Sequence, residues 1–208
     1  MSSHGIIELY ERRAHDYDHD RSRVLHERAW IEEFLRHVGP SGTILDLGCG
    51  MGEPIARHLL ERGYRVLGVD SSPTLIELCR ARFPAGEWLV ADMRLVQLAR
   101  RFDGILAWDS FFHLSRNYQR GMFARFAAHA EPGAPLMFTS GISDGVVIGS
   151  YHGEPLHHAS LDPAEYRRLL ELSGFDVRAH RLEDPECGGR TVWLATGDRA
   201  GHVVVKQQ

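Results

Sequence analysis

The chain has no excess of positive charge, a single lysine and no long apolar run. Its 24 basic residues, of which only Lys206 is a lysine, face 28 acidic ones, which gives a formal charge of -4. Proteins that bind nucleic-acid backbones present net basic surfaces, so this balance argues against nucleic acid as a partner. No apolar stretch reaches the roughly 20 residues of a membrane-spanning helix, and residues 1–5 do not resemble a secretory leader. We therefore expect a cytoplasmic protein that binds neither membranes nor nucleic acids.

Cysteine is also scarce, with Cys49, Cys79 and Cys187 as the three examples. Their spacing matches no zinc-binding or redox pattern, and the histidines show no metal-ligand spacing either. We expect idle thiols in a reducing compartment and no metal site. The length of 208 residues fits a single domain over residues 1–208.

Short apolar runs alternate with amphipathic stretches through the middle of the chain. Strands are predicted at residues 43–47, 65–69, 87–91, 102–108 and 135–139, with helices between them, and two closing strands at 175–182 and 191–196. This alternation predicts an α/β doubly wound fold, in which helices cover both faces of a mostly parallel sheet. Residues 1–40 read as a helical cap, with helices over 6–20 and 24–38. Residues 142–161, rich in Gly, Ser and His without a clear period, are expected to form an irregular lid over a substrate.

The strongest motif is the run Asp-Leu-Gly-Cys-Gly-Met-Gly at residues 46–52, between a buried strand and a helix. Glycines at that point allow a sharp turn and a close approach of the backbone to a ligand. The dinucleotide pattern Gly-x-Gly-x-x-Gly fails in both frames, because its third position falls on Glu53 or Ile55, and the P-loop lysine is absent. Acidic residues in this region suit a ligand with a cationic centre better than a diphosphate.

The next two predicted strands each end in an aspartate. Asp70, followed by Ser71, closes the second strand and is placed to accept hydrogen bonds from ribose hydroxyls. Asp92 closes the third, where its carboxylate can meet the amine of an adenine while Met93 lies against the ring. Together with the glycine loop, these residues describe a site for adenosine without phosphate.

These motifs resemble the class I S-adenosylmethionine-dependent methyltransferase family. The resemblance extends from the Tyr- and Asp-rich segment at residues 10–18 to the closing strands, and it implies a seven-stranded sheet whose last strand is antiparallel. It also implies S-adenosylmethionine as cofactor and a small molecule as methyl acceptor, at an O or N atom. The implied cofactor-binding residues are Tyr17, Asp46, Gly48, Cys49, Gly50, Asp70, Ser71, Asp92, Met93 and Trp108.

Histidine supplies the candidates for acceptor chemistry, with 13 copies in the chain. His113 follows the fourth strand and is the candidate catalytic base, because imidazole titrates near neutral pH. Such a base is needed only where the acceptor is protonated at working pH. Tyr151, His152 and His157, within the expected lid, are the candidate substrate-binding residues.

Three other functions stay open on the sequence. One is a non-catalytic S-adenosylmethionine-binding regulatory protein, which sequence hardly separates from an enzyme. A nicotinamide-dependent oxidoreductase is disfavoured by the failed dinucleotide pattern, and a nucleic-acid methyltransferase by the net charge. The sequence leaves open whether the protein is a monomer or a homodimer.

Overall fold

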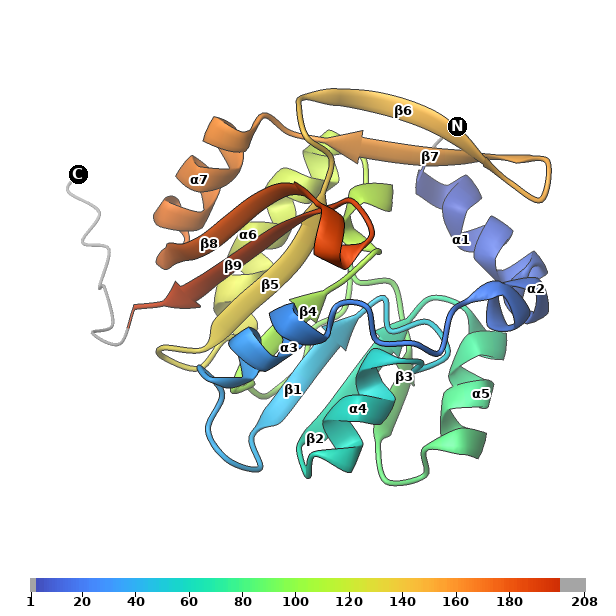
Figure 1. The fold of residues 1–208 in the computed structure, drawn as a ribbon, viewed down its shortest axis with the longest axis horizontal. Coiled ribbons are helices and arrows are strands. Elements are labelled where there is room, and N and C mark those ends of the chain that lie inside the picture. Colours follow the sequence, from blue (N-terminus) through green and yellow to red (C-terminus); the bar gives the residue numbers. More distant parts are fainter. Residues whose placement is uncertain (1–2, 199–208) are drawn as a thin grey trace.

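A computed structural model describes residues 3–198 and shows a seven-stranded sheet in the order β3-β2-β1-β4-β5-β9-β8 (Figure 1). The strands are β1 (Thr43–Leu47), β2 (Arg65–Asp70), β3 (Glu87–Val90), β4 (Gly104–Ala107), β5 (Pro135–Ser140), β8 (Phe175–Asp184) and β9 (Arg190–Gly197). Strands β1 to β5 pair in parallel, whereas β9 runs antiparallel to both β5 and β8. The predicted fold class and the antiparallel last strand are confirmed.

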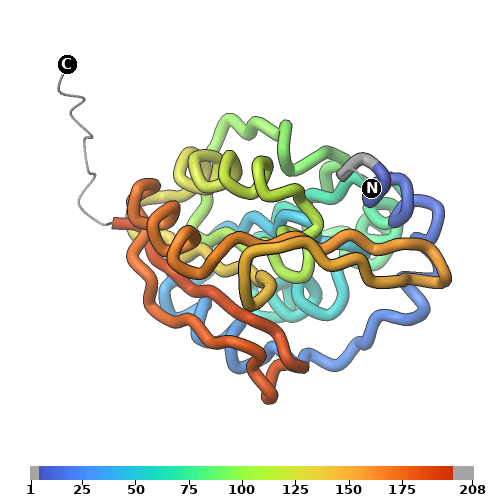
Figure 2. Tube along the Cα trace, turned by 90° about the horizontal axis from the view of Figure 1, so that it is seen from above, coloured from blue at the N-terminus to red at the C-terminus, as the bar shows by residue number. Residues whose placement is uncertain are grey.

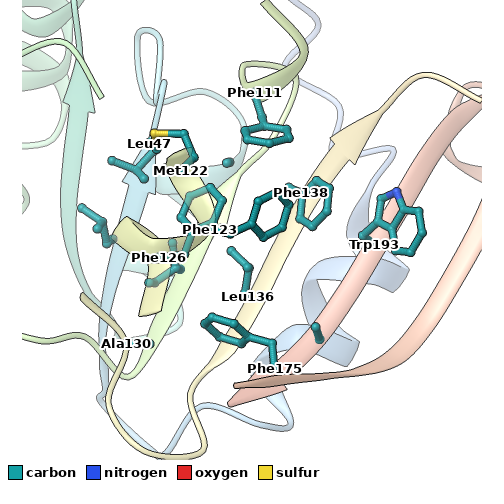
Figure 3. Close-up of a cluster of buried hydrophobic side chains, with 14 of the residues drawn as sticks. Leu47, Phe111, Met122, Phe123, Phe126, Ala130, Leu136, Phe138, Phe175 and Trp193 are labelled. Atoms are coloured by element: carbon teal, nitrogen blue, oxygen red, sulfur yellow. The ribbon is translucent and has the colours of Figure 1, made fainter. Parts of the chain in front are cut away.

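Helices cover both faces of the sheet. They are α3 (Arg28–Leu35), α4 (Ile55–Glu61), α5 (Pro73–Arg82), α6 (Arg116–His129) and α7 (Pro163–Leu172). The N-terminal helices α1 (Ser3–Arg12) and α2 (Ala14–Asp20) pack instead against α5. Adjacent strand residues point to opposite faces. Leu45 and Ile105 therefore pack with α6 and α7 in one buried cluster (Figure 3), while Ile44 and Leu106 pack with α3 and α4 in another. Both faces are buried, which explains the continuous apolar runs of the strands.

Local signals fix several helix starts as the sequence predicts. Ser72 caps α5, its Oγ accepting from the N–H of Leu75, and Asp162 caps α7 by accepting from Ala164. The N-terminal cap differs in detail from the prediction, because α1 and α2 replace one helix over 6–20. The following helix, α3, is shorter than the predicted 24–38 segment.

The expected irregular segment at residues 142–161 is instead an ordered hairpin of β6 (Gly145–Tyr151) and β7 (Glu154–Ser160). It forms a separate two-stranded sheet that extends from the end of β5 to the N-terminal helices, above the main sheet (Figures 1 and 2). Most of β6 is exposed, so these strands lack the alternation that would have revealed them.

Within residues 3–198, no helix is both long enough and apolar enough to cross a bilayer.

Candidate functional site

The glycine loop after β1 is fastened to the neighbouring strand. The N–H groups of Gly48 and Cys49 both donate to the carbonyl of Val69, at 2.7 and 3.2 Å. Gly48 has φ +79°, and a Cβ there would lie 2.3 Å from Cβ of Ser110. A side chain is therefore excluded at this position by backbone conformation and by space. Gly50, with φ +55°, would bring a Cβ to 3.1 Å from the ring of Tyr17.

Asp70 connects this loop to the start of α5. Its carboxylate accepts from the N–H of Gly50 at 3.0 Å and of Ser72 at 2.9 Å. Burial raises the pKa of Asp70, although these backbone donors act in the opposite direction. The ends of β1 and β2 are thus held in one fixed arrangement.

An inner cavity of about 700 Å³, open mouth included, lies over these strand ends. Of the predicted cofactor residues, it is lined by Tyr17, Gly48, Gly50, Asp70, Ser71, Asp92 and Met93. Arg94, which the sequence reading missed, also lines it. The Arg94 guanidinium forms an ion pair with Asp92, in which Nε lies 2.9 and 2.8 Å from the two carboxylate oxygens. It also lies over the ring of Tyr118.

A larger outer cavity, of about 1640 Å³ including its opening, adjoins the inner one beneath the β6–β7 hairpin. Four residues line both cavities: Tyr10, Tyr17, Asp109 and His113. A group bound in the inner cavity therefore meets a group bound in the outer cavity at these side chains. Tyr10, Asp109 and Arg190 are functional candidates that were not among the predicted site residues. Tyr10, in the Tyr- and Asp-rich segment, and Asp109, near a strand end, carried local signals, whereas Arg190 carried none.

His113 is buried at this junction and has both ring nitrogens engaged. Its Nδ1 lies 3.0 Å from the carbonyl of His157, so Nδ1 carries the proton and donates it. The Nε2 lone pair then accepts from the hydroxyl of Tyr10 at 3.0 Å. Burial lowers the pKa of His113 to about 4. The imidazole is therefore neutral near pH 7, and its basic nitrogen reaches the cavities through the Tyr10 hydroxyl.

The two tyrosines at the junction are held in their neutral forms. Burial raises the pKa of Tyr17 to about 12 and that of Tyr10 well above its usual value. Their rings pack edge to face, with centroids 5.4 Å apart. Both come from the N-terminal cap, which therefore walls the inner cavity.

Asp109 is the second residue after β4 and has a left-handed conformation, with φ +48°. Arg190 Nε lies 2.9 Å from each carboxylate oxygen of Asp109, and Arg21 Nη1 donates to Oδ2 of Asp109 at 3.1 Å. Arg21 in turn lies 3.4 Å from the buried carboxylate of Glu27. Non-glycine residues in such conformations concentrate at functional sites.

Several predicted residues lie elsewhere. Asp46 is 4% exposed, behind the loop, where burial and nearby Asp70 raise its pKa to about 7. Cys49 is buried, with its Sγ 3.6 Å from the Gly50 carbonyl. Trp108 belongs to the apolar cluster that contains Phe34 and Leu59. Their side chains are thus absent from the described linings of both cavities, so the structure does not support direct cofactor contacts for them.

The predicted substrate residues are also displaced from the outer cavity. His157 turns its side chain away, and its neighbour His158 lines the cavity instead, because adjacent strand residues face opposite sides. Tyr151 and His152 lie at the hairpin tip, where both bond to Asp20. Of these three residues, His157 contacts the site through its backbone carbonyl, which accepts from Nδ1 of His113.

Comparison with known proteins agrees with this arrangement. Residues 44–133 match a family described as "Methyltransferase domain". An O-methyltransferase of Pyrenophora dematioidea is 29% identical over 78% of this chain and 66% of its own length. A dTDP-3-amino-3,6-dideoxy-alpha-D-glucopyranose N,N-dimethyltransferase of Streptomyces fradiae is 31% identical over 54% of this chain and 40% of its own. The matches thus span less than two thirds of these curated relatives.

Among solved structures, the 1,6-didemethyltoxoflavin-N1-methyltransferase of Burkholderia thailandensis, bound to its acceptor and S-adenosylhomocysteine, has a TM-score of 0.71. It is 21% identical, over 93% of this chain and 86% of its own. The amino pentose methyltransferase CalS10 of Micromonospora echinaspora, with S-adenosylmethionine bound, has a TM-score of 0.70 at 17% identity, over 89% and 95% of the two chains. The shared fold, the glycine loop at the ends of β1 and β2 and the matched residues lead to one conclusion: this chain contains a methyltransferase domain and has the fold of class I S-adenosylmethionine-dependent methyltransferases.

Proposed function

We propose that the protein uses S-adenosylmethionine to methylate an O or N atom of a small molecule. The observation that carries this proposal is the charge of the inner cavity. Asp70, Asp92 and Asp109 line it. Asp92 is paired with Arg94, the one arginine or lysine in the described lining, and Asp109 is paired with Arg21 and Arg190. The carboxylate of Asp70 bonds instead to backbone N–H groups and keeps its negative charge beside the glycine loop. A dinucleotide diphosphate would meet carboxylates there, whereas a nucleoside with a cationic sulfonium is electrostatically favoured.

The residues fit the parts of that cofactor. Asp70 is fixed by the backbone and has its carboxylate at the strand end, where ribose hydroxyls can donate to it. Gly48 and Gly50 leave room beside the loop, and Asp92 with Met93 suits the adenine end. Tyr17 of α2 lines the same cavity. Bound S-adenosylmethionine supplies an activated methyl group, so the protein's task is to hold and orient the reactants.

The outer cavity is the candidate acceptor site. It combines Phe112, Leu156 and Val146 with polar groups, which suits a small, partly apolar acceptor. His113 remains our candidate base for an acceptor that must lose a proton. With Nε2 bonded to Tyr10, such a proton would pass to the Tyr10 oxygen while the Tyr10 proton moves to Nε2. An acceptor that carries a free lone pair at working pH would need neither group as a base.

The experiment that tests the proposal is calorimetric titration with S-adenosylmethionine and, separately, with a nicotinamide dinucleotide. We expect binding of the first alone, weakened in Asp70→Ala and unchanged in Asp176→Ala, which alters an exposed acid on β8. Binding of the dinucleotide alone would refute the proposal. Release of S-adenosylhomocysteine with a panel of small amines, phenols and carboxylates then separates an enzyme from a regulatory protein that only binds the cofactor.

Two finer statements stay predictions. We expect the protein to be cytoplasmic, and we expect it to be a monomer or a homodimer. Size-exclusion chromatography with light scattering distinguishes the monomer from the homodimer.

A further inference from the structure

The tip of the β6–β7 hairpin lies against the helices that wall the inner cavity. The hairpin leaves the main sheet near β5 and extends over the outer cavity until its turn reaches α1 and α2 (Figures 1 and 2). One element thus spans the candidate acceptor site and ends on the cap of the candidate cofactor site.

Two clusters of charged and polar contacts fasten this tip, and we call them together the clasp. In the first, Glu154 accepts from Arg12 at 2.6 Å and from Arg13 at 2.9 Å. In the second, Asp20 binds Nε2 of His152 at 2.7 Å and accepts from the Tyr151 hydroxyl at 3.1 Å. Glu154 and Asp20 are therefore the two carboxylates on which the clasp depends.

The other half of the hairpin has separate anchors. Ser160 Oγ accepts from the N–H of Gly141 at 3.0 Å, and Gln119 donates to the carbonyl of Ala159 at 2.8 Å. In contrast, Val146, Val147 and Ile148 of β6 are 50%, 67% and 53% exposed. Because a two-stranded hairpin alone is marginally stable in water, the tip depends on the clasp for its position.

The helices of the clasp are themselves docked around the inner cavity. Glu11 of α1 accepts from the Thr74 hydroxyl of α5 at 2.8 Å, and Asp18 of α2 pairs with Arg82 at 2.5 Å. Tyr10 and Tyr17, from the same two helices, line the inner cavity. A ligand that packs against these tyrosines therefore also holds the helices that carry Arg12, Arg13 and Asp20.

We propose that Glu154 and Asp20 are positioning residues through which occupation of the cofactor site closes the hairpin over the acceptor site. This inference rests on the proposed function, because it takes the inner cavity as the cofactor site. Its consequence is ordered binding, in which the acceptor finds a complete cavity only after the cofactor is bound.

The test is hydrogen exchange of the hairpin amides, residues 145–160, with and without S-adenosylhomocysteine. We expect the nucleoside to slow exchange in the unmodified protein by about fivefold or more, the lower end of usual coupling between sites. In the double variant Glu154→Gln, Asp20→Asn this protection should be lost although the nucleoside still binds. The single variant Glu154→Asp keeps a carboxylate at this position and an unchanged Asp20, so it should retain part of the protection. The matched control is Glu87→Gln, which removes another exposed ion pair, between the edge strand β3 and Arg100, and should keep full protection.

Calorimetry in the same samples separates the two proposals. If the nucleoside binds but does not protect the hairpin, or protects it equally in the double variant, the proposed role of the clasp is refuted and the proposed function is not. If the nucleoside does not bind, both the proposed function and the proposed role of the clasp are refuted.

Discussion

Replacing Gly48 by alanine tests whether the loop after β1 is shaped by backbone conformation alone or also by contact with Ser110. An alanine in the left-handed region costs roughly 1–2 kcal/mol. Its Cβ would also lie 2.3 Å from Cβ and 2.8 Å from Oγ of Ser110, whose hydroxyl donates to the Leu47 carbonyl at 2.7 Å. Overpacking of this kind costs typically 1–3 kcal/mol more. We therefore expect Gly48→Ala to lower the free energy of unfolding by about 2–5 kcal/mol.

Gly63 provides the matched control. Its φ of +82° is nearly the same as that of Gly48, but no heavy atom lies within 4 Å of an added Cβ. Gly63→Ala should therefore show the conformational cost alone, about 1–2 kcal/mol. Urea unfolding followed by circular dichroism measures both variants, and calorimetry measures their affinity for S-adenosylmethionine. Equal free energies of unfolding within about 0.5 kcal/mol, the usual error of such comparisons, would refute the steric argument. We expect cofactor affinity to fall only in Gly48→Ala.

Three further predictions concern the site and the core. Asp70→Ala should weaken S-adenosylmethionine binding by about 1.5–3 kcal/mol in calorimetry, the range for hydrogen bonds to a charged group. Because the pKa of His113 is lowered to about 4 from 6.5, the folded state resists its protonation. Stability should fall as pH decreases from 6.5 towards 4, and urea unfolding of His113→Gln should show a smaller fall. Phe123→Ala removes a ring packed against Phe111 and Phe138, and it should cost about 3–5 kcal/mol of unfolding free energy.

The sheet and the loop were predictable because their signals are local. Each buried strand is a continuous apolar run, and each turn that follows needs residues that tolerate unusual backbone angles. The aspartates that end β2 and β3 could be placed at the same edge without coordinates, since parallel strands finish together. Ser72 and Asp162 identified helix starts for the same reason, as capping acts over three residues.

The hairpin could not be predicted, because nothing in residues 142–161 alternates. Val146, Val147 and Ile148 are consecutive and all exposed, so no face of β6 carries a buried set. Even with the strands known, the register decides whether His157 or His158 faces the cavity, and a shift of one residue exchanges them. One contact that orients β7 over the cavity joins residues 44 positions apart, the bond between His113 and the His157 carbonyl.

The chemistry of His113 shows most clearly what sequence leaves out. Its position after β4 predicts a place at the wall of the site, and in the structure it lines both cavities. Its strength as a base depends instead on burial, on the His157 carbonyl and on a hydroxyl 103 positions away, that of Tyr10. Burial lowers the pKa of His113 and keeps the imidazole neutral and weakly basic, although the bond to the His157 carbonyl acts in the opposite direction, and the Tyr10 hydroxyl occupies its Nε2. A strongly acidic ammonium or phenol could still lose its proton through that pair, whereas an ordinary alcohol has no group at this junction basic enough to activate it.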